Sequence, residues 1–255
     1  MAREVKKDRS EVCADFNETE SHLSLTTMQT MLPQHRQTCL FLAALLAGLV
    51  FAECAHKPPP WSSRISPVEQ FGPDVDLSLR LDSDSVDVPL LEWAIFLETN
   101  RQRARLGLKP LKFEPRLQYV AEQHSREMVR LGYFEHNSPV PSNATLTKRI
   151  RHVGIKEGIG GENIAIHPVT RRQDAIFRAA QAGPTASKYA WRNEGDDYTY
   201  AEFARDLVNR WLNSPPHRRN VLNKQFHYLG VGLAQARYKD IEVFYVTQDF
   251  SSANY

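Results

Sequence analysis

The sequence predicts an α+β fold in which a group of helices precedes a C-terminal sheet. Apolar residues recur at helical spacing in the stretches 90–106, 115–131 and 198–212. Two β-rich stretches, 227–237 and 241–250, close the chain, and the few residues between them suit a hairpin. Helices and strands that are separated along the chain in this way are typical of α+β domains.

The amino-acid composition excludes few classes of protein, but it limits the possible partners and the ways in which the fold can be stabilised. The 255-residue chain is 42% hydrophobic and 24% charged, and its formal net charge of +2 gives no indication of a nucleic-acid partner. The three cysteines, Cys13, Cys39 and Cys54, all lie near the N-terminus. The remaining chain therefore has neither a disulfide nor a thiolate metal site, and a hydrophobic core must stabilise it.

The N-terminal region has the pattern of an exported protein. Residues 1–30 are polar and suggest a disordered lead or a start codon placed too early, whereas 31–52 resemble a signal peptide. The apolar run that ends at Ala52 is shorter than the roughly 20 residues of a spanning helix. We expect cleavage after Ala52, no integral membrane span afterwards, and a secreted, periplasmic or cell-envelope protein. A lipoprotein through Cys54 and an uncleaved anchor are the alternatives.

Residues 53–88 are rich in Pro, Ser and Asp and are predicted to be a linker. The folded domain is assigned to 89–255. Its first helix should end at Gly107 and its second should span Pro115–Leu131. His124 lies on the apolar face of the second helix, where a buried, hydrogen-bonded histidine is favoured over a ligand.

Three further stretches carry candidate side chains. His136 lies in a loop that follows the second helix, and a short helix is expected at 146–152. Gly160 and Gly161 can hold the next two residues, Glu162 and Asn163, at an irregular bend, although a surface turn is the alternative.

Ser214 precedes two prolines, so a new helical turn is expected to begin at Pro215 or Pro216, with His217 in its first turn. The positive end of a helix disfavours imidazolium, so His217 should be neutral and able to bind a metal or accept a proton. A simple hydrogen bond within the loop is the alternative.

The segment 167–200 combines a short amphipathic stretch with an aromatic, basic loop. Tyr189, Trp191, Tyr198 and Tyr200 lie among arginines and lysines. We hypothesise that part of this segment overhangs the site and contacts a ligand or partner, and a surface loop is the alternative.

Taken together, the motifs YFEHNSP, GGENIA, WLNSPPHRRNVL, GVG and YVTQDF resemble the CAP superfamily of cysteine-rich secretory proteins, antigen 5 and pathogenesis-related 1 proteins. The resemblance covers about residues 90–250 and is greatest to the bacterial secreted branch. It implies a three-layer α-β-α sandwich with a cleft lined by two histidines and two acidic residues. Matched motif by motif, these are His136, Glu162 and His217, and the second acidic position falls on Ser214. The tetrad is therefore incomplete.

Two histidines and a glutamate are a possible ligand set for Zn²⁺ or another divalent metal, with open positions for water or substrate. Such a site could activate water for hydrolysis. The three residues come from separate segments, without a short helical histidine pair, so weak metal binding is an equal expectation, and no cofactor is certain. A serine nucleophile at Ser214, near His217 and Glu162, lacks the Gly-x-Ser-x-Gly elbow.

Three functions stay open. The first is a secreted binding module for a lipid, a glycan or a cell-wall component. The second is a metal-assisted hydrolase or protease that uses His136, Glu162 and His217. The third is an envelope-interaction protein in which these residues form only a structural hydrogen-bond cluster. The sequence does not determine the oligomeric state.

Overall fold

The computed structural model describes residues 59–62, 66–72, 74–156, 158–174, 177, 197–238 and 240–253. The polar lead, the predicted signal peptide and most of the 167–200 segment lie outside these ranges. The chain divides into two compact units, residues 1–57 and 58–255, and the description below concerns the second.

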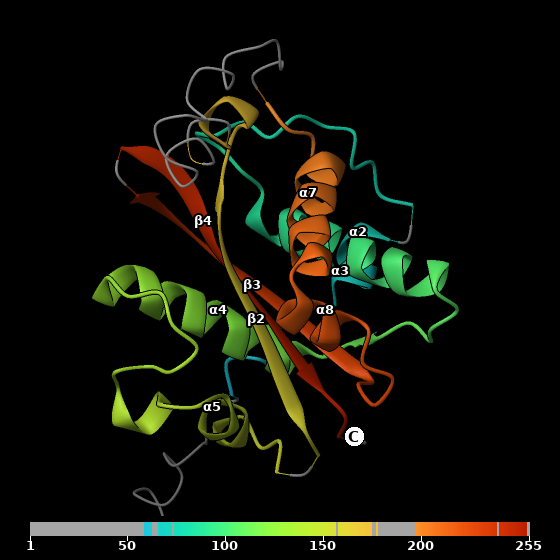
Figure 1. Ribbon diagram of the computed structural model, residues 1–255, viewed down its shortest axis with the longest axis vertical. Helices are drawn as coiled ribbons and strands as arrows, with labels where there is room; N and C mark the ends of the chain where they lie inside the picture. The colour runs from blue at the N-terminus through green and yellow to red at the C-terminus, as the bar shows by residue number, and fades with distance from the viewer. Residues whose placement is uncertain are drawn as a thin grey trace, which may run out of the picture. The chain divides into compact units, whose positions relative to one another are not determined.

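The centre of the fold is a four-stranded sheet (Figure 1). Its strands are β1 (Lys112–Phe113), β2 (Gly160–Pro168), β3 (Tyr228–Tyr238) and β4 (Ile241–Ser251), in the spatial order β1-β3-β4-β2. The predicted hairpin is present: β3 and β4 are antiparallel and close at the pair Tyr238–Ile241. β2 runs antiparallel to β4, and β1 runs parallel to β3. β2 is therefore an edge strand.

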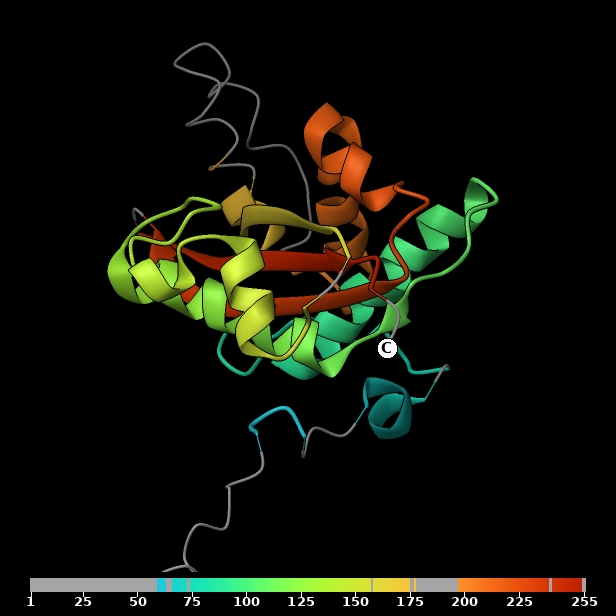
Figure 2. The ribbon, with the colours of Figure 1, turned by 90° about the horizontal axis from the view of Figure 1, so that it is seen from below.

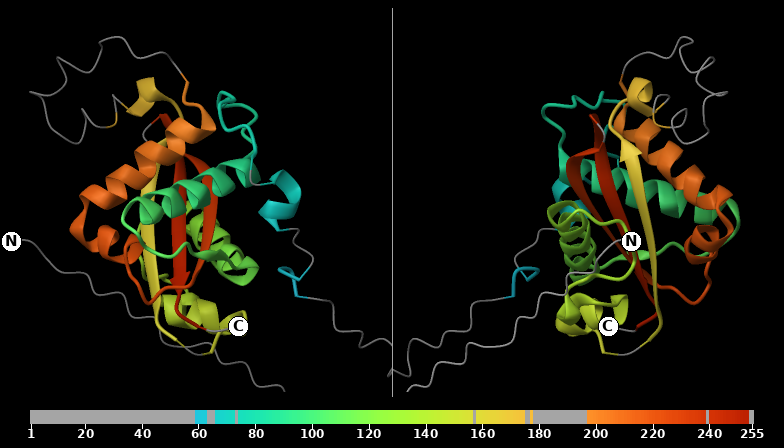
Figure 3. Two further views of the ribbon diagram at one scale, coloured as in Figure 1. Left: turned by 90° about the vertical axis from the view of Figure 1, so that its right-hand side faces the viewer. Right: turned by 60° about the vertical axis from the view of Figure 1, so that its left-hand side comes forward.

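Helices cover both faces of the sheet, which makes the domain a three-layer α-β-α sandwich (Figure 2). α3 (Val88–Arg105) and α7 (Tyr200–Asn213) pack on one face and on each other, and α4 (Pro115–Leu131) packs on the opposite face (Figure 3). These three helices confirm those predicted from apolar spacing. The shorter helices are α2 (Pro67–Phe71), α5 (Leu146–His152), α8 (Pro215–Val221) and a 3-10 turn, Pro141–Asn143.

Local chemistry explains where the long helices begin and end. The Glu114 side chain accepts a hydrogen bond from Arg116 N at the start of α4, and Gly132 ends α4 in the left-handed region at φ 68°. At the start of α7, Thr199 and Glu202 form a reciprocal capping box. These signals are local in sequence, so the bounds of both helices follow from a few neighbouring residues.

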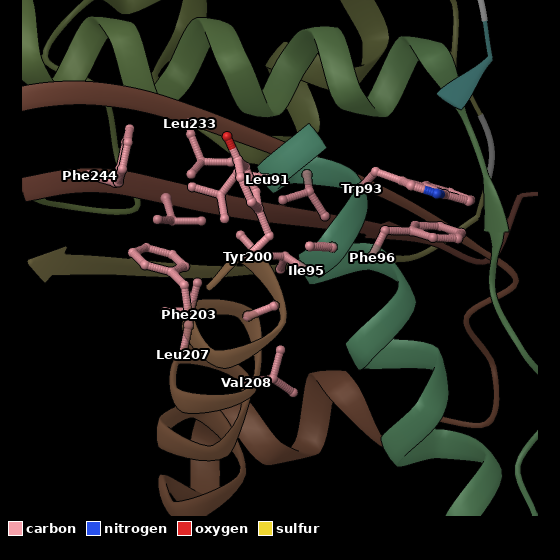
Figure 4. Packing of buried hydrophobic residues seen from close by; sticks show 14 of the residues in the cluster. Leu91, Trp93, Ile95, Phe96, Tyr200, Phe203, Leu207, Val208, Leu233 and Phe244 are labelled. Carbon is pink, nitrogen blue, oxygen red and sulfur yellow. The ribbon is translucent and has the colours of Figure 1, made fainter. Parts of the chain in front are cut away.

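The main core lies between the sheet and the α3–α7 layer (Figure 4). Leu91 and Ile95 of α3 face Phe203 and Leu207 of α7, and Phe244 of β4 closes the layer with an edge-on ring contact to Phe203. All five are fully buried. Burying one such side chain contributes roughly 1.5–3 kcal/mol, so this layer is a principal source of the stability that the cysteine-free region needs.

The register of the sheet places Glu162, Asp249 and Gly230 in one row across β2, β4 and β3. Side chains in one row point to the same face, here the face that α4 covers. A Cβ atom on Gly230 would lie 2.1 Å from the main chain of α4, and one on Gly232 would lie 2.0 Å from it. The two glycines of the GVG motif therefore let the backbone of α4 rest directly on β3.

The structure corrects the expectation for Gly160–Asn163. These residues begin strand β2 and pair with Ser251–Gln248 of β4, so they form neither a bend nor a surface turn. β4 also has no separate buried and exposed faces over most of its length. Residues 243–251 are buried throughout, because β4 has a neighbouring strand on each side and helices above and below.

Part of the predicted linker packs on the domain. Leu81 is fully buried in the main core, and Arg80 forms an isolated bridge with Thr199. α2 also lies in this segment and contacts α3. Residues 66–72 and 74–88 therefore belong structurally to the folded domain.

Candidate functional site

The candidate site lies at the free edge of the sheet, along β2. Glu162 and Asn163 are consecutive in this strand, so their side chains point to opposite faces. Glu162 points to the α4 face, where it meets His136 and Arg149. Asn163 points to the other face, where its amide donates a hydrogen bond to the carbonyl of His217 at 3.3 Å. The edge strand thus links the two histidines predicted to line a cleft.

Glu162 is a buried carboxylate held by positive partners. Its side chain is 4% exposed; Oε1 accepts from His136 Nδ1 at 2.8 Å, and Oε2 accepts from Arg149 Nη2 at 2.5 Å. Burial opposes ionisation, but the His136 hydrogen bond and the Arg149 charge hold the pKa of Glu162 below its usual range. The Glu162 carboxylate is therefore charged, and each of its oxygens accepts a hydrogen bond.

His136 is the exposed member of this group, with 52% of its side chain accessible. The hydrogen bond to Glu162 raises the pKa of its imidazole, against a smaller opposing effect of burial. Arg149 fixes the same loop by donating to the His136 carbonyl at 3.1 Å. His136 Nδ1 is thus turned inward, which leaves Nε2 as the ring nitrogen available to a ligand.

His217 approaches from the other side of β2. α8 begins at Pro215, as predicted, and places His217 in its first turn, where Ser214 Oγ lies 2.8 Å from Nδ1. Burial lowers the pKa of His217, and the nearby charge of His136 lowers it further. The predicted neutral state agrees with this direction, but the causes are burial and the second histidine. Here too Nε2 is the remaining ring nitrogen.

Amide side chains join the two halves of the site. Asn220 of α8 donates to the Glu162 carbonyl and to Asn163 Oδ1, each at 2.9 Å. Asn163 also donates to Gln248 Oε1 at 3.3 Å, in the core of the sheet. Hydrogen bonds therefore join α8 directly to β2, the strand that carries Glu162.

His124 lies beneath this group on α4 and is 1% exposed. Its Nε2 lies 3.2 Å from the Glu135 carbonyl and 3.9 Å from Glu162 Oε2, and Tyr133 Oη lies 3.4 Å from Nδ1. Burial lowers the pKa of His124. The geometry is that of a buried, hydrogen-bonded histidine that supports the loop leading to His136.

Sequence reasoning missed two members of the site, Arg149 and Asp249. Arg149 belongs to a short, basic helix that resembled a solvated segment, and only the fold brings it to Glu162. Asp249 is fully buried beside Glu162 in the sheet register. Burial and the Glu162 charge raise its pKa well above the usual range, which favours the protonated form of this carboxyl. Within the described ranges, no group donates a hydrogen bond to either Asp249 oxygen.

A metal site built from His136, Glu162 and His217 was one prediction. Both histidines have an oriented Nδ1 and a remaining Nε2, which is a common arrangement for metal-binding imidazoles. Both oxygens of Glu162, however, are already engaged by His136 and Arg149. In the part of the chain that the structure describes, no three His, Cys, Asp or Glu side chains form a group suited to a metal ion. Metal binding here stays a prediction.

Most of the segment 167–200 lies outside the described ranges, including Tyr189 and Trp191. Tyr198 and Tyr200, which were expected to contribute to a ligand-contacting surface, are instead buried in the main core, each 5% exposed. Their rings close the α3–α7 layer, and the guanidinium of Arg171 lies 5.1 Å from the centre of the Tyr198 ring.

The three-layer sandwich and the histidine–glutamate group at its sheet edge define a CAP-type domain. Comparison with known families agrees: residues 96–250 match CAP, the cysteine-rich secretory protein family, and the chain belongs to that family.

Two curated relatives come from Bacillus subtilis (strain 168). The uncharacterized protein YkwD is 28% identical over 138 residues, which are 54% of this chain and 40% of YkwD. The uncharacterized membrane protein YlbC is 29% identical over 140 residues, which are 55% of this chain and 30% of YlbC. The matched region therefore spans less than half the length of either relative.

Two of the similar solved structures come from bacteria. An extracellular protein containing a SCP domain from Bacillus anthracis str. Ames is 28% identical, with a TM-score of 0.43, over 64% of this chain and 40% of its own. An outer surface protein from Borrelia burgdorferi is 18% identical, with a TM-score of 0.41, over 69% of this chain and 99% of its own. Among the described residues of the present chain, no helix is both long enough and apolar enough to cross a bilayer.

Proposed function

We propose that this protein is an exported CAP-domain binding module that recognises a polar group of an envelope ligand with the Nε2 atoms of His136 and His217. The observation that carries the proposal is the orientation of the two rings. Glu162 holds Nδ1 of His136 and Ser214 holds Nδ1 of His217, each at 2.8 Å. Both imidazoles are therefore held in a fixed orientation. They differ in how readily they are protonated, because the pKa of His136 is raised and that of His217 is lowered.

Such a pair suits a ligand group that both donates and accepts hydrogen bonds. A protonated His136 donates from Nε2, and a neutral His217 can accept there. Lipid head groups, glycans and cell-wall fragments all carry groups of this kind. Export is part of the proposal, and the signal-peptide pattern of residues 31–52 supports it.

The alternative, a metal-assisted hydrolase, requires Glu162 to bind a metal while both of its oxygens accept hydrogen bonds from His136 and Arg149. The metal would compete with the buried Arg149–Glu162 pair, and breaking a buried ion pair costs about 3–5 kcal/mol. The geometry therefore favours binding over metal-assisted hydrolysis.

The test compares retention of the full chain on isolated cell wall and on phospholipid vesicles for the wild type and two variants. His217→Ala and His136→Ala should reduce retention on one of these materials at least tenfold. The control, His227→Ala, removes an exposed histidine outside the site and should leave retention unchanged. Unchanged retention in both site variants would contradict the proposal. Uptake of one equivalent of Zn²⁺ that is lost in His217→Ala, together with hydrolysis of the bound material, would favour the alternative.

A further inference from the structure

A cavity of about 280 Å³ lies between α4 and α5, next to the His136–Glu162 group, with which it shares Arg149 and His124. Neither of these histidines, nor Glu162, lines it. This volume is just below the roughly 300–1,000 Å³ that is typical of small-molecule pockets. The cavity therefore has room for one ring-sized ligand and is too small for a long acyl chain.

One wall of this cavity is aromatic and apolar. Trp61 and Tyr119 lie with their ring centres 5.4 Å apart, and Val120 and Val153 continue the surface. Trp61 is held by a tight turn in which Ser62 N donates to the Pro59 carbonyl at 2.8 Å. An aromatic face of this kind attracts C–H groups that carry a slight positive charge, in addition to its apolar contact area.

The opposite wall is polar and combines acceptors with donors. Glu127 accepts hydrogen bonds from Tyr133 at 2.8 Å, from Ser138, and from Asn143 at 3.0 Å. Burial opposes its ionisation, but these bonds together hold the pKa of Glu127 below its usual range. Glu127 and Asn143 both line the cavity, so an ionised carboxylate and an amide are present side by side.

Arg149 adds an unused donor to this wall. Its residue is 5% exposed, and its two Nη atoms donate to Glu162, to the His136 carbonyl and to the Asn143 carbonyl. The remaining Nε is buried without a hydrogen-bond partner among the described residues. A buried donor without an acceptor costs about 1–3 kcal/mol, so a small shift of the Arg149 side chain that brings Nε to an acceptor oxygen of a ligand would be stabilising.

The charges on this wall select against an anionic ligand. The guanidinium of Arg149 is already paired with Glu162, and Glu127 adds a second negative charge nearby. A further anion would therefore be repelled, whereas a neutral hydroxyl can donate to Glu127 and, once the Arg149 side chain shifts, accept from its Nε.

From these contacts we infer that the α4–α5 cavity binds a single neutral sugar ring, with one face of the ring against Trp61 and Tyr119 and its hydroxyls towards Arg149, Asn143 and Glu127. A pyranose matches this arrangement because its C–H face is apolar and its edge carries groups that both donate and accept. Gln123 and His152 are exposed at the rim, so a ligand can enter from solvent. The inference concerns a second site and does not depend on the proposed role of His136 and His217.

The test uses the full chain and three probes: methyl glycosides of N-acetylglucosamine and of glucose, and oleate as the lipid probe. Saturation-transfer NMR detects ring protons of a bound sugar, and the indole N–H signal of Trp61, assigned by its loss in Trp61→Phe, reports on the cavity itself. We expect at least one glycoside to shift the Trp61 signal saturably, with a dissociation constant on the order of millimolar for so small a ligand. The indole signals of Trp93 and Trp211, both buried in the main core, should not move.

Two variants and a matched control complete the test. Trp61→Ala and Asn143→Leu should each weaken sugar binding at least fivefold, and Trp61→Phe should retain it. Leu106→Ala, which truncates an exposed apolar residue at the end of α3, should leave binding unchanged. The inference is overturned if neither glycoside shifts Trp61, if Trp61→Ala binds as well as the wild type, or if oleate alone shifts the Trp61 signal. Loss of binding on His217→Ala with no change on Trp61→Ala would also overturn it, because the sugar would then occupy the other site.

Discussion

Replacement of Arg149 by methionine should destabilise the domain more than any comparable change to a surface arginine. Arg149 and Glu162 are 5% and 4% exposed at their side chains, so the substitution leaves a buried carboxylate without its guanidinium. It also removes the donors that serve the His136 and Asn143 carbonyls, each at 3.1 Å. Breaking the buried ion pair alone costs about 3–5 kcal/mol, and we take this as the expected loss because the two carbonyls are only part-buried and water can replace part of what they lose.

Urea unfolding at neutral pH, followed by tryptophan fluorescence and circular dichroism, measures this loss. With a slope of about 2 kcal/mol per molar urea, the midpoint should fall by about 1.5–2.5 M. The matched control is Arg101→Met, which removes an arginine whose side chain is 40% exposed in its pair with Glu98. A partly exposed pair of this kind contributes about 0–1 kcal/mol. If Arg149→Met lowered stability by less than about 1 kcal/mol with an unchanged slope, the reasoning about the buried pair would be refuted.

Three further predictions concern the site and the sheet. Glu162→Gln should lower the pKa of His136, which the Glu162 hydrogen bond raises, and an NMR titration that shows no change would contradict this assignment. Because the folded-state pKa of His136 is raised, the stability that its pair contributes should be complete below its unfolded pKa near 6.5 and decline as pH rises through the folded value. Asp249→Asn should gain stability relative to the wild type as pH rises above about 4. The reason is that the carboxyl of the unfolded wild type ionises there, while the carboxyl of the folded protein keeps its proton. If the stabilities of the two proteins changed in parallel with pH, Asp249 would not be protonated in the folded state. Gly232→Ala should cost about 3 kcal/mol, because its Cβ would lie 2.0 Å from the main chain of α4. Gly160→Ala, whose nearest neighbour is a flexible side chain at 3.2 Å, should cost less than about 1 kcal/mol in the same unfolding assay, and equal losses for the two glycines would contradict the close approach of α4.

The elements that the sequence predicted well are those with local signals. Pro115 and Gly132 mark the ends of α4, and the Pro-Pro break at 215 marks the start of α8. β2 was missed because its first two residues are glycines, which usually indicate turns, whereas here they pair with β4. Pairing with a distant strand overrides this local preference, and no feature within residues 160–168 reveals it.

The residues of the candidate site also fall into two groups: those that sequence motifs identify and those that only the fold reveals. His136, Glu162 and His217 were identified through motifs that resemble the CAP superfamily. Arg149 and Asp249 could not be assigned, because their roles depend on burial. A basic residue in a short polar helix usually faces solvent, and here packing of α5 against α4 and β2 turns it inward. Buried charge networks of this kind depend on tertiary packing that no local pattern specifies.

The row formed by Glu162, Asp249 and Gly230 limits the ways in which substitutions can alter the specificity of the candidate site. A shift of β2 by one residue along β4 would exchange the faces of Glu162 and Asn163, and the carboxylate would then be directed at α8 instead of Arg149. Intermediate positions do not exist, since strand pairing moves in whole residues. New specificity in such a protein is therefore expected to arise by exchanging residues in the 132–140 loop and in α8, while the edge strand between them stays the same.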